Sequence, residues 1–220
     1  GQGSIDVRAR TLTFGPDAKR QQARLTGRIR RLALADFDGD DRQDLVVFWA
    51  YSGKESLYLG LGGGRFKEVV KQQGLVEDEE SQSLLVQDLD GDGKREVLQV
   101  QPGFVRVLRV DAKGRLYIAR QLSWEHGRID RLLPYTRGKR GAQLVAISGR
   151  QARVVKIEPG ADGFGLLDTL DLTGVHLGDP AAGDVDGDGR QDLIGWHQGA
   201  IKVLLRRPPR RILTSRINLN

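Results

Sequence analysis

The sequence predicts an all-β protein, a β-propeller of four-stranded antiparallel blades, with four full blades and a partial one. Three observations predict this fold. Glycine accounts for 29 of the 220 residues, about twice its usual share, which favours many turns over long helices. The apolar residues form short runs rich in Val, Leu and Ile, which are typical of strands. A pattern recurs roughly every 49 residues, a period typical of propeller blades.

The recurring segment runs from an apolar or small-residue stretch, through a short loop, into a second apolar stretch. Three copies have an acidic loop: residues 32–48 (LALADFDGDDRQDLVVF), 84–100 (LLVQDLDGDGKREVLQV) and 180–196 (PAAGDVDGDGRQDLIGW). A fourth copy at 131–147 (RLLPYTRGKRGAQLVAI) keeps the apolar flanks and the glycine, Gly138, but lacks the acids. The four copies are therefore one structural unit, repeated.

Each copy continues into a second pair of strands that a hairpin turn joins. The turns are expected at Gly62–Gly64, Asp111–Gly114, Pro159–Gly163 and Pro208–Pro209, because glycine and proline mark hairpin connections. The second strand of each unit is apolar at nearly every residue, which predicts burial on both faces. Each unit is thus four strands, with the acidic loop between the first and the second.

We expect a single propeller domain in five segments. Residues 1–28 form the partial blade, and the full blades are 29–80, 81–127, 128–176 (with the degenerate loop) and 177–220. The segment 5–28 resembles only the two outer strands of a blade, and no strand pair follows Asn220 to complete it. Either that blade is truncated, or the chain is a fragment, or a partner completes the open blade.

The three acidic loops have the composition of calcium sites. Each carries carboxylates at positions 1, 3, 5 and 9, and alternate residues of a curled loop can point inward together. The carbonyl of position 7 adds an oxygen. Calcium takes six to eight oxygen ligands, whereas magnesium prefers fewer carboxylates and keeps water. Without a cation, the crowded carboxylates would repel one another, and a merely solvated turn would not recur in register three times.

We therefore predict three Ca²⁺ ions. The expected ligands of the first are Asp36, Asp38, Asp40, Asp44 and the Arg42 carbonyl. Those of the second are Asp88, Asp90, Asp92, Glu96 and the Lys94 carbonyl. Those of the third are Asp184, Asp186, Asp188, Asp192 and the Arg190 carbonyl. An EF-hand is excluded, because position 12 is Val47, Gln99 or Gly195 instead of glutamate and the flanks are strands.

The motif DxDGDGxxD between two strands resembles the FG-GAP/VCBS repeat family, which includes the head propeller of integrin α-subunits. The resemblance implies a β-propeller whose loops bind structural calcium. The Phe-Gly pair stands at Phe14-Gly15 and Phe164-Gly165. Asp41 replaces the glycine expected at position 6 of the first loop, and we keep that site because aspartate tolerates a left-handed backbone.

The third copy departs from this pattern. Its ligand positions are Tyr135, Arg137, Lys139 and Gln143, so that two cations replace two carboxylates. We predict no metal there, and expect an internal charge or hydrogen-bond network to hold the hairpin instead.

The net charge of +6 conceals a segregation of charge, because the three loops contain thirteen of the 29 acidic residues. Three calcium ions would raise the net charge to +12. Basic clusters occur at Lys19–Arg31, Arg137–Arg140 and Arg206–Arg216. They suit an acidic protein, an anionic glycan or a membrane surface, or they are simply a solvated face. Aromatic residues are only 6% and no nucleic-acid motif occurs, so we expect no specific nucleic-acid partner.

An enzyme is not expected. Cysteine is absent, which excludes thiol catalysis and disulfides, and no catalytic motif surrounds His126, His176 or His197. The predicted function is a protein-binding or adhesion module, or an accessory subunit of a larger assembly. The alternative is a lectin with pockets between blades. Trp124 is a candidate for stacking on sugars, whereas Trp49 and Trp196 end second strands, where core packing is expected.

An extracytoplasmic location, periplasmic, secreted or at the cell surface, is expected. Calcium is abundant outside the cytoplasm, and the chain contains neither Cys nor Met, even at position 1. No stretch reaches the ~18 apolar residues of a transmembrane helix, so no transmembrane segment is predicted.

Overall fold

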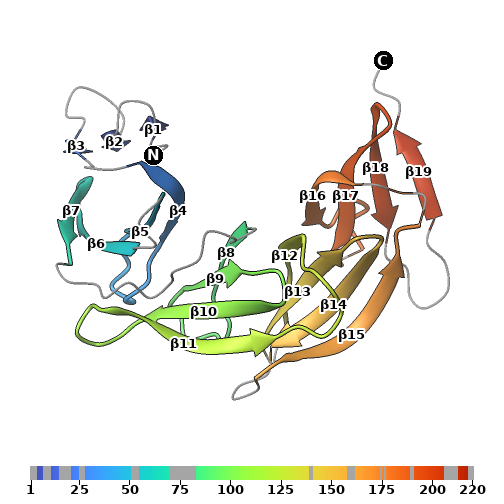
Figure 1. Ribbon diagram of the computed structural model, residues 1–220. Coiled ribbons are helices and arrows are strands. Elements are labelled where there is room, and N and C mark those ends of the chain that lie inside the picture. Colours follow the sequence, from blue (N-terminus) through green and yellow to red (C-terminus); the bar gives the residue numbers. More distant parts are fainter. Residues whose placement is uncertain are drawn as a thin grey trace. The chain divides into compact units, whose positions relative to one another are not determined.

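The computed structural model describes residues 4–6, 11–14, 21–24, 28–50, 55–69, 83–138, 141–157, 162–173, 175, 177–188, 191–205 and 213–217. All regular structure in these ranges is β-strand (Figure 1), which confirms the predicted class. None of the described segments is a helix that could cross a bilayer. The chain divides into two compact units, one of Gly1–Gln101 with Val105–Gln121 and one of Pro102–Phe104 with Leu122–Asn220.

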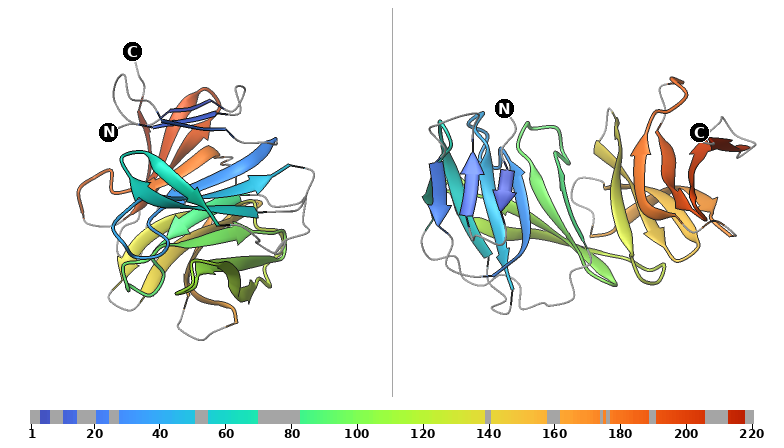
Figure 2. Two further views of the ribbon diagram at one scale, coloured as in Figure 1. Left: turned by 90° about the vertical axis from the view of Figure 1, so that its left-hand side faces the viewer. Right: turned by 90° about the horizontal axis from the view of Figure 1, so that it is seen from above.

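Four sheets each contain four strands in chain order, and all neighbouring strands are antiparallel (Figures 1 and 2). The first sheet consists of β4 (Ile29–Ala35), β5 (Asp44–Trp49), β6 (Glu55–Gly62) and β7 (Arg65–Glu68). The second consists of β8 (Ser83–Gln87), β9 (Glu96–Val100), β10 (Phe104–Val110) and β11 (Leu116–Ser123). These meanders are the predicted blades.

The remaining two blades have the same order. The third consists of β12 (Arg131–Gly138), β13 (Gly141–Ser148), β14 (Gln151–Ile157) and β15 (Phe164–Asp171). The fourth consists of β16 (Gly178–Gly183), β17 (Asp192–His197), β18 (Ala200–Leu205) and β19 (Leu213–Ile217). Within the first unit β4 lies beside β8, and within the second β12 lies beside β16. Within each unit the first strands of the two blades are thus neighbours, as in a propeller.

A three-stranded sheet precedes the first blade. It contains β1 (Ser4–Asp6), β2 (Thr11–Phe14) and β3 (Gln21–Arg24) in chain order. The partial blade is therefore present, but the expectation of two strands was wrong by one. The sequence of β3, QQAR, has a single apolar residue, so it has none of the alternation that indicates a strand.

The second strands of the first two blades are buried on both faces, as predicted, whereas β17 in the fourth blade has an exposed residue near its end. Every residue of β9 is buried, and in β5 all but the last. The two faces of β5 contribute to different clusters. Val46 packs with Leu57, Val97 and Leu108 in the core between the first two blades. Leu45 and Val47 pack with Tyr58 in a separate cluster. Because β5 has an apolar core on each side, every residue after Asp44 in this strand is apolar.

Two predicted hairpin turns join third and fourth strands. Between β6 and β7, Gly62, Gly63 and Gly64 all have positive φ, at 75°, 60° and 77°. Between β10 and β11, the Gly114 amide donates to the Asp111 carbonyl at 2.9 Å. The Pro208–Pro209 turn and most of the turn at 159–163 lie outside the described residues.

The three tryptophans differ in burial. Trp49 is half-buried and donates from Nε1 to Ser56 Oγ at 2.9 Å. Trp124 is buried and meets Phe164 edge-on at 5.5 Å between ring centroids. Trp196 is 55% exposed, so the expectation that it packs in the core was wrong. Residues alternate along β17, and Leu193 belongs to the core of this unit, so Trp196 points to the opposite face.

Candidate metal centre

The three acidic loops connect the first and second strands of three blades. In each loop the carboxylate at position 9 is the first residue of the second strand: Asp44 in β5, Glu96 in β9 and Asp192 in β17. All three side chains are buried. The carboxylates at positions 1, 3 and 5 lie on the loop itself. Each loop therefore places several carboxylates where the first and second strands of its blade are joined.

One set of three hydrogen bonds occurs in all three loops: the amide of position 2 donates to the carboxylate of position 9, that of position 4 to position 1, and that of position 5 to position 3. In the first loop the pairs are Phe37–Asp44 (2.9 Å), Gly39–Asp36 (2.6 Å) and Asp40–Asp38 (3.2 Å). In the second they are Leu89–Glu96 (2.8 Å), Gly91–Asp88 (2.6 Å) and Asp92–Asp90 (3.3 Å). In the last they are Val185–Asp192 (3.0 Å), Gly187–Asp184 (2.8 Å) and Asp188–Asp186 (3.2 Å).

The loop backbone turns through the left-handed region at position 4. Gly39, Gly91 and Gly187 have φ of 86°, 83° and 77°, where a side chain would be strained. Position 6 is also left-handed in the first two loops, at Asp41 (63°) and Gly93 (93°). Asp41 therefore adopts the conformation in which the motif has glycine, and this curl directs successive carboxylates to one side.

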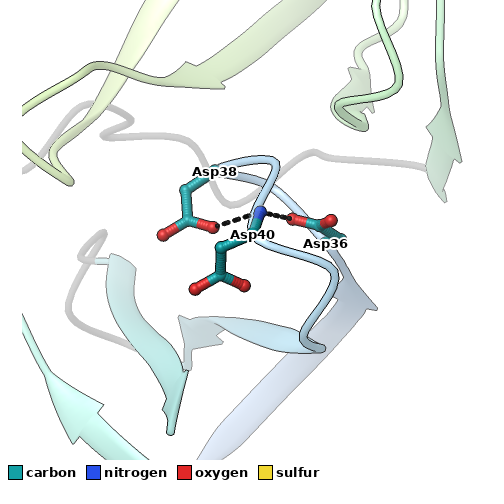
Figure 3. Close-up of side chains that lie close together, drawn as sticks. All are labelled: Asp36, Asp38 and Asp40. Carbon is teal, nitrogen blue, oxygen red and sulfur yellow. Dashed lines mark hydrogen bonds between the residues drawn. The ribbon is translucent and has the colours of Figure 1, made fainter.

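The curl brings the acids together. In three groups, one carboxylate oxygen of each residue lies within 4.8 Å of one from each of the others: Asp36, Asp38 and Asp40 (Figure 3), then Asp88, Asp90 and Asp92, and then Asp184, Asp186 and Asp192. A cation that binds oxygens at about 2.3–2.6 Å spans oxygens up to about 5 Å apart. The donors and their spacing therefore fit a hard metal ion.

The other expected ligands lie close by with different roles. Asp44, Glu96 and Asp188 are outside these groups of three. The Arg42 and Lys94 amides donate to Asp40 and Asp92 at 2.9 and 2.8 Å, so position 7 borders the cluster in both loops. Arg190 is outside the described residues.

The first loop is clamped to β6 at Gly60, a contact that sequence analysis missed. Asp44 accepts the Gly60 amide at Oδ1 (2.8 Å) and the Phe37 amide at Oδ2. Arg42 donates from Nε to the Gly60 carbonyl at 2.7 Å, and its guanidinium also pairs with Asp40. A Cβ on Gly60 would lie 2.3 Å from the Gln43 carbonyl oxygen. Only glycine lets β6 approach the loop so closely.

Electrostatics in the loops disfavour an uncompensated negative charge. Burial, reinforced by the charges of Asp44 and Asp40, raises the pKa of Asp38. Burial also raises the pKa of Asp44, although amide donors partly offset it. Burial raises the pKa of Glu96 to about 6, against the Leu89 amide and Arg109. A bound cation would offset the free-energy cost of keeping these buried and crowded carboxylates ionised.

The second loop contains a basic partner that sequence analysis did not identify. Nη2 of Arg109, on β10, lies 2.6 Å from Asp90 Oδ2 and 2.6 Å from Glu96 Oε1. Burial alone would raise the pKa of Asp90, but the hydrogen bond and the charge of Arg109, together with backbone amide donors, outweigh it and the pKa is lowered. No pattern within the repeat marks Arg109. The contact depends on strand pairing, in which Val97, the residue after Glu96, pairs with Leu108, the residue before Arg109.

The first two loops also contact each other. The Arg95 amide donates to the Asp36 carbonyl at 3.0 Å. The aliphatic part of Lys94 packs so closely on Gly39 that a Cβ there would lie 2.9 Å from Lys94 Cε. The backbones of neighbouring loops therefore support each other within this unit.

The third blade has extended strands where the others have a loop. β12 and β13 pair as far as Arg137 with Ala142 and Gly138 with Gly141, with one irregularity between Pro134 and Thr136. Tyr135, at position 1 of the degenerate copy, is a core residue with 4% exposure. Without a carboxylate cluster, the strands continue to pair. The predicted network at Arg137 and Lys139 lies outside the described side chains.

Comparison with known families agrees with the motif. Residues 36–99, which include the first two acidic loops, match the FG-GAP-like repeat. This confirms the family resemblance predicted from the sequence. A search of curated proteins found no significant match.

Among solved structures, a rhamnogalacturonan lyase of Bacillus licheniformis (PL11) is 17% identical, with a TM-score of 0.48, over 75% of this chain and 39% of its own. The exotype rhamnogalacturonan lyase YesX is 17% identical, with a TM-score of 0.47, over 80% of this chain and 39% of its own. This chain thus spans about two fifths of either structure.

Gly60→Ala should destabilise the protein by about 1–3 kcal/mol, because the new Cβ would collide with the Gln43 carbonyl and force a backbone shift. Chemical denaturation measures the effect. Gly103→Ala is the matched control, since nothing lies within 4 Å of its Cβ position. Equal stability of the two variants would contradict the close approach.

The metal-stripped protein should lose stability as the pH rises, because the pKa of Glu96 is about 6 in the folded state against 4.5 in the unfolded chain. The folded state holds this proton more tightly, so the stabilisation is complete below pH 4.5 and is lost as the pH passes 6. The loss amounts to about 2 kcal/mol. Urea unfolding at pH 4.5 and 7 measures it, with Glu96→Gln as the reference. If the free energy of unfolding changed equally between the two pH values in wild type and variant, this contribution of Glu96 would be ruled out.

Proposed function

We propose that this chain is a non-catalytic, calcium-stabilised β-propeller that acts outside the cytoplasm as a protein-binding or adhesion module, or as an accessory subunit of a larger assembly. One observation carries the calcium part of the proposal. Three loops in the same place of three blades each bring carboxylate oxygens within 4.8 Å of one another. All three use the same hydrogen bonds to do so.

Calcium is the cation that fits these donors best. The groups offer only oxygen ligands, which excludes a preference for thiolate- or imidazole-seeking metals. Several carboxylates on one loop suit the high and variable coordination of calcium better than the octahedral, partly hydrated shell of magnesium. The proposed ligands are the loop carboxylates at positions 1, 3, 5 and 9 and the carbonyl at position 7.

The proposed role of calcium is structural. Each loop joins the first and second strands of a blade, and the second strand lies in the core of the propeller. An ion bound there stabilises the strand pair and leaves the loop carboxylates unavailable as catalytic acids or bases. In the part of the chain that the structure describes, every acidic group of three belongs to these loops.

A macromolecular partner is proposed from charge and from the partial blade. With three calcium ions the net charge would be +12, which favours an acidic protein or an anionic glycan surface. The sheet of β1–β3 has one strand fewer than the full blades. Sheet edges are templates for pairing with another chain, so a partner strand is the proposed complement of this blade.

Calcium should raise the thermal stability of the full chain. Stabilisation by linkage reaches about 4 kcal/mol per site at 1,000 times the Kd. Differential scanning calorimetry in calcium and in chelator measures it, and native mass spectrometry should count three ions. Asp38→Asn with Asp40→Asn should remove one ion, whereas Asp168→Asn, in β15, should remove none. An unchanged melting temperature in excess chelator would overturn the calcium assignment.

The partner is tested by affinity capture from a native extracytoplasmic extract in calcium buffer, with release by chelator and analysis of protein and glycan. A stoichiometric protein, absent from capture with the Asp38→Asn/Asp40→Asn variant, is the expected result. Recovery of neither protein nor glycan would contradict a binding module.

Glycan binding is the second candidate, and one observation favours it. Trp196 is 55% exposed, and an exposed indole offers a flat apolar face to a sugar ring. Recovery of glycan without protein, lost in Trp196→Ala and retained in Trp49→Phe, would replace the first proposal with this one.

A further inference from the structure

We propose that the loops 36–44 and 88–96 bind calcium cooperatively, because the Lys94–Arg95 peptide group and the backbone of Asp36 join the two sites. The inference rests on the proposed function, since it couples two sites that must each bind calcium. It goes beyond that function by making the affinity of one loop depend on the occupancy of the other. Both loops belong to the same compact unit.

One peptide group takes part in both sites. Its carbonyl, that of Lys94, stands at position 7 of the second loop and is a proposed calcium ligand. Its N–H, that of Arg95, donates to the carbonyl of Asp36, position 1 of the first loop, at 3.0 Å. The group is trans and planar, so its C=O and N–H point in opposite directions. The bond to the first loop therefore fixes the orientation in which the Lys94 carbonyl is presented to the second loop.

A second peptide group continues the connection into the first loop. The Asp36 carbonyl shares this group with the Phe37 amide, which donates to Asp44 Oδ2 at 2.9 Å. Asp44 is the buried carboxylate at position 9 and a proposed ligand of the first ion. Two planar peptide groups and two hydrogen bonds thus link a proposed ligand of one ion to a proposed ligand of the other.

The side chain of Lys94 makes another contact between the loops. Its aliphatic part covers Gly39 so closely that a Cβ there would lie 2.9 Å from Lys94 Cε and 3.2 Å from Lys94 Cγ. The Gly39 amide donates to Asp36 Oδ1 at 2.6 Å, which is one of the hydrogen bonds that curl the first loop. The second loop therefore supports the first at the turn that gathers its carboxylates.

An ion in one loop removes part of the ordering cost in the other. An ion held by both Asp36 and Asp44 would tie position 1 to position 9 and so fix the backbone to which Arg95 bonds. Less ordering of the Lys94 carbonyl then remains when the second ion binds, and the effect is reciprocal by thermodynamic linkage. The net contribution of one hydrogen bond corresponds to about a two- to tenfold gain in affinity.

Repulsion between the two ions acts against this coupling. The carboxylates at positions 3 and 5 of both loops are half-buried or exposed, so salt screens that repulsion. The hydrogen bonds and the packing of Lys94 on Gly39 join uncharged groups and are not screened. The cooperative gain should therefore persist at physiological ionic strength and should not decrease as salt is added.

The test is a calcium titration of the full chain followed by ¹H–¹⁵N NMR at physiological ionic strength. The amides of Gly39, Gly91 and Gly187 each donate to the first aspartate of their own loop, so each reports on one site. Gly187 belongs to the other compact unit and serves as the reference site.

Two double variants give the affinity of each site without an ion in its neighbour. Asp38→Asn/Asp40→Asn leaves the second site, and Asp90→Asn/Asp92→Asn leaves the first. Each pair removes the two negative charges that a calcium ion would neutralise, so the empty variant loop and the loaded wild-type loop have equal net charge. A two-site fit to both variants and the wild type yields one coupling factor. That factor should favour double occupancy by about two- to tenfold.

Arg95→Pro removes the N–H donor and keeps the Lys94 carbonyl, so it should abolish most of the coupling. The factor is again measured with and without the substitutions in the neighbouring loop. Arg95→Ala is the matched control, since it removes the same exposed side chain but keeps the N–H, and it should retain the coupling.

Hydrogen exchange tests the contact without altering it. In Asp90→Asn/Asp92→Asn, calcium in the first loop should slow exchange of the Arg95 amide by about twofold or more. The Gly149 amide, which donates to Asp130 Oδ2 at 2.8 Å in the other unit, is the control and should not change. If Arg95→Pro does not fold, this measurement decides.

The outcomes separate the two proposals. If the glycine amides respond to calcium but the coupling is absent, unfavourable or lost as salt is added, cooperativity is overturned while calcium binding stands. If Arg95→Pro folds and retains the full coupling, or if the Gly187 midpoint shifts with that of Gly91, the link through this peptide group is overturned. If none of the three amides responds to calcium, the proposed function fails, and this inference with it.

Discussion

The hydrogen bond between the second residue of each acidic loop and the carboxylate that starts the next strand is the constraint on which the rest of the structure depends. It holds a buried acid, Asp44, Glu96 or Asp192, at the end of a strand that packs in the core. Because the bond is made from the backbone, it fixes the loop path whatever residue stands at position 2. The carboxylates at positions 1, 3 and 5 are then displayed on one side of the curl, where they repel one another and attract a cation.

The first three blades deal with the charge at this point differently. The first buries Asp44 under two amide donors and clamps the loop to β6 at Gly60. The second adds the guanidinium of Arg109. The third has exchanged its carboxylates for other residues, and its strands simply continue to pair. The backbone of a blade therefore tolerates an acidic loop, an acidic loop with a bound arginine side chain, or continued strand pairing in place of the loop. This tolerance is what allows a repeat protein to retain its fold while individual sites diverge.

The recurrence of the loops argues for stabilisation as their common task, because a catalytic centre needs one site with unlike groups, whereas these sites are alike. In the first unit the loops also contact each other, through the Arg95 amide and the Asp36 carbonyl. Order in one loop thus supports its neighbour. If the proposed binding function holds, a propeller rigidified in this way would present its surfaces with little conformational freedom and so lower the entropic cost of binding a large partner.

The sequence by itself determined the blade repeat, the position of the acidic loops, the burial of the second strands in the first two blades and the loss of the acids in the third copy. These features are local or periodic: each depends on residues within one repeat, and comparison between repeats reveals them. Only the tertiary structure decided which residues meet the loops from other strands. Gly60 and Arg109 lie 16 and 13 positions beyond the carboxylates that they contact, and their pairing depends on strand register. It also placed Trp196 on an open face and made β3 a strand despite its polar sequence, because burial and edge pairing depend on neighbouring elements, which no local pattern encodes.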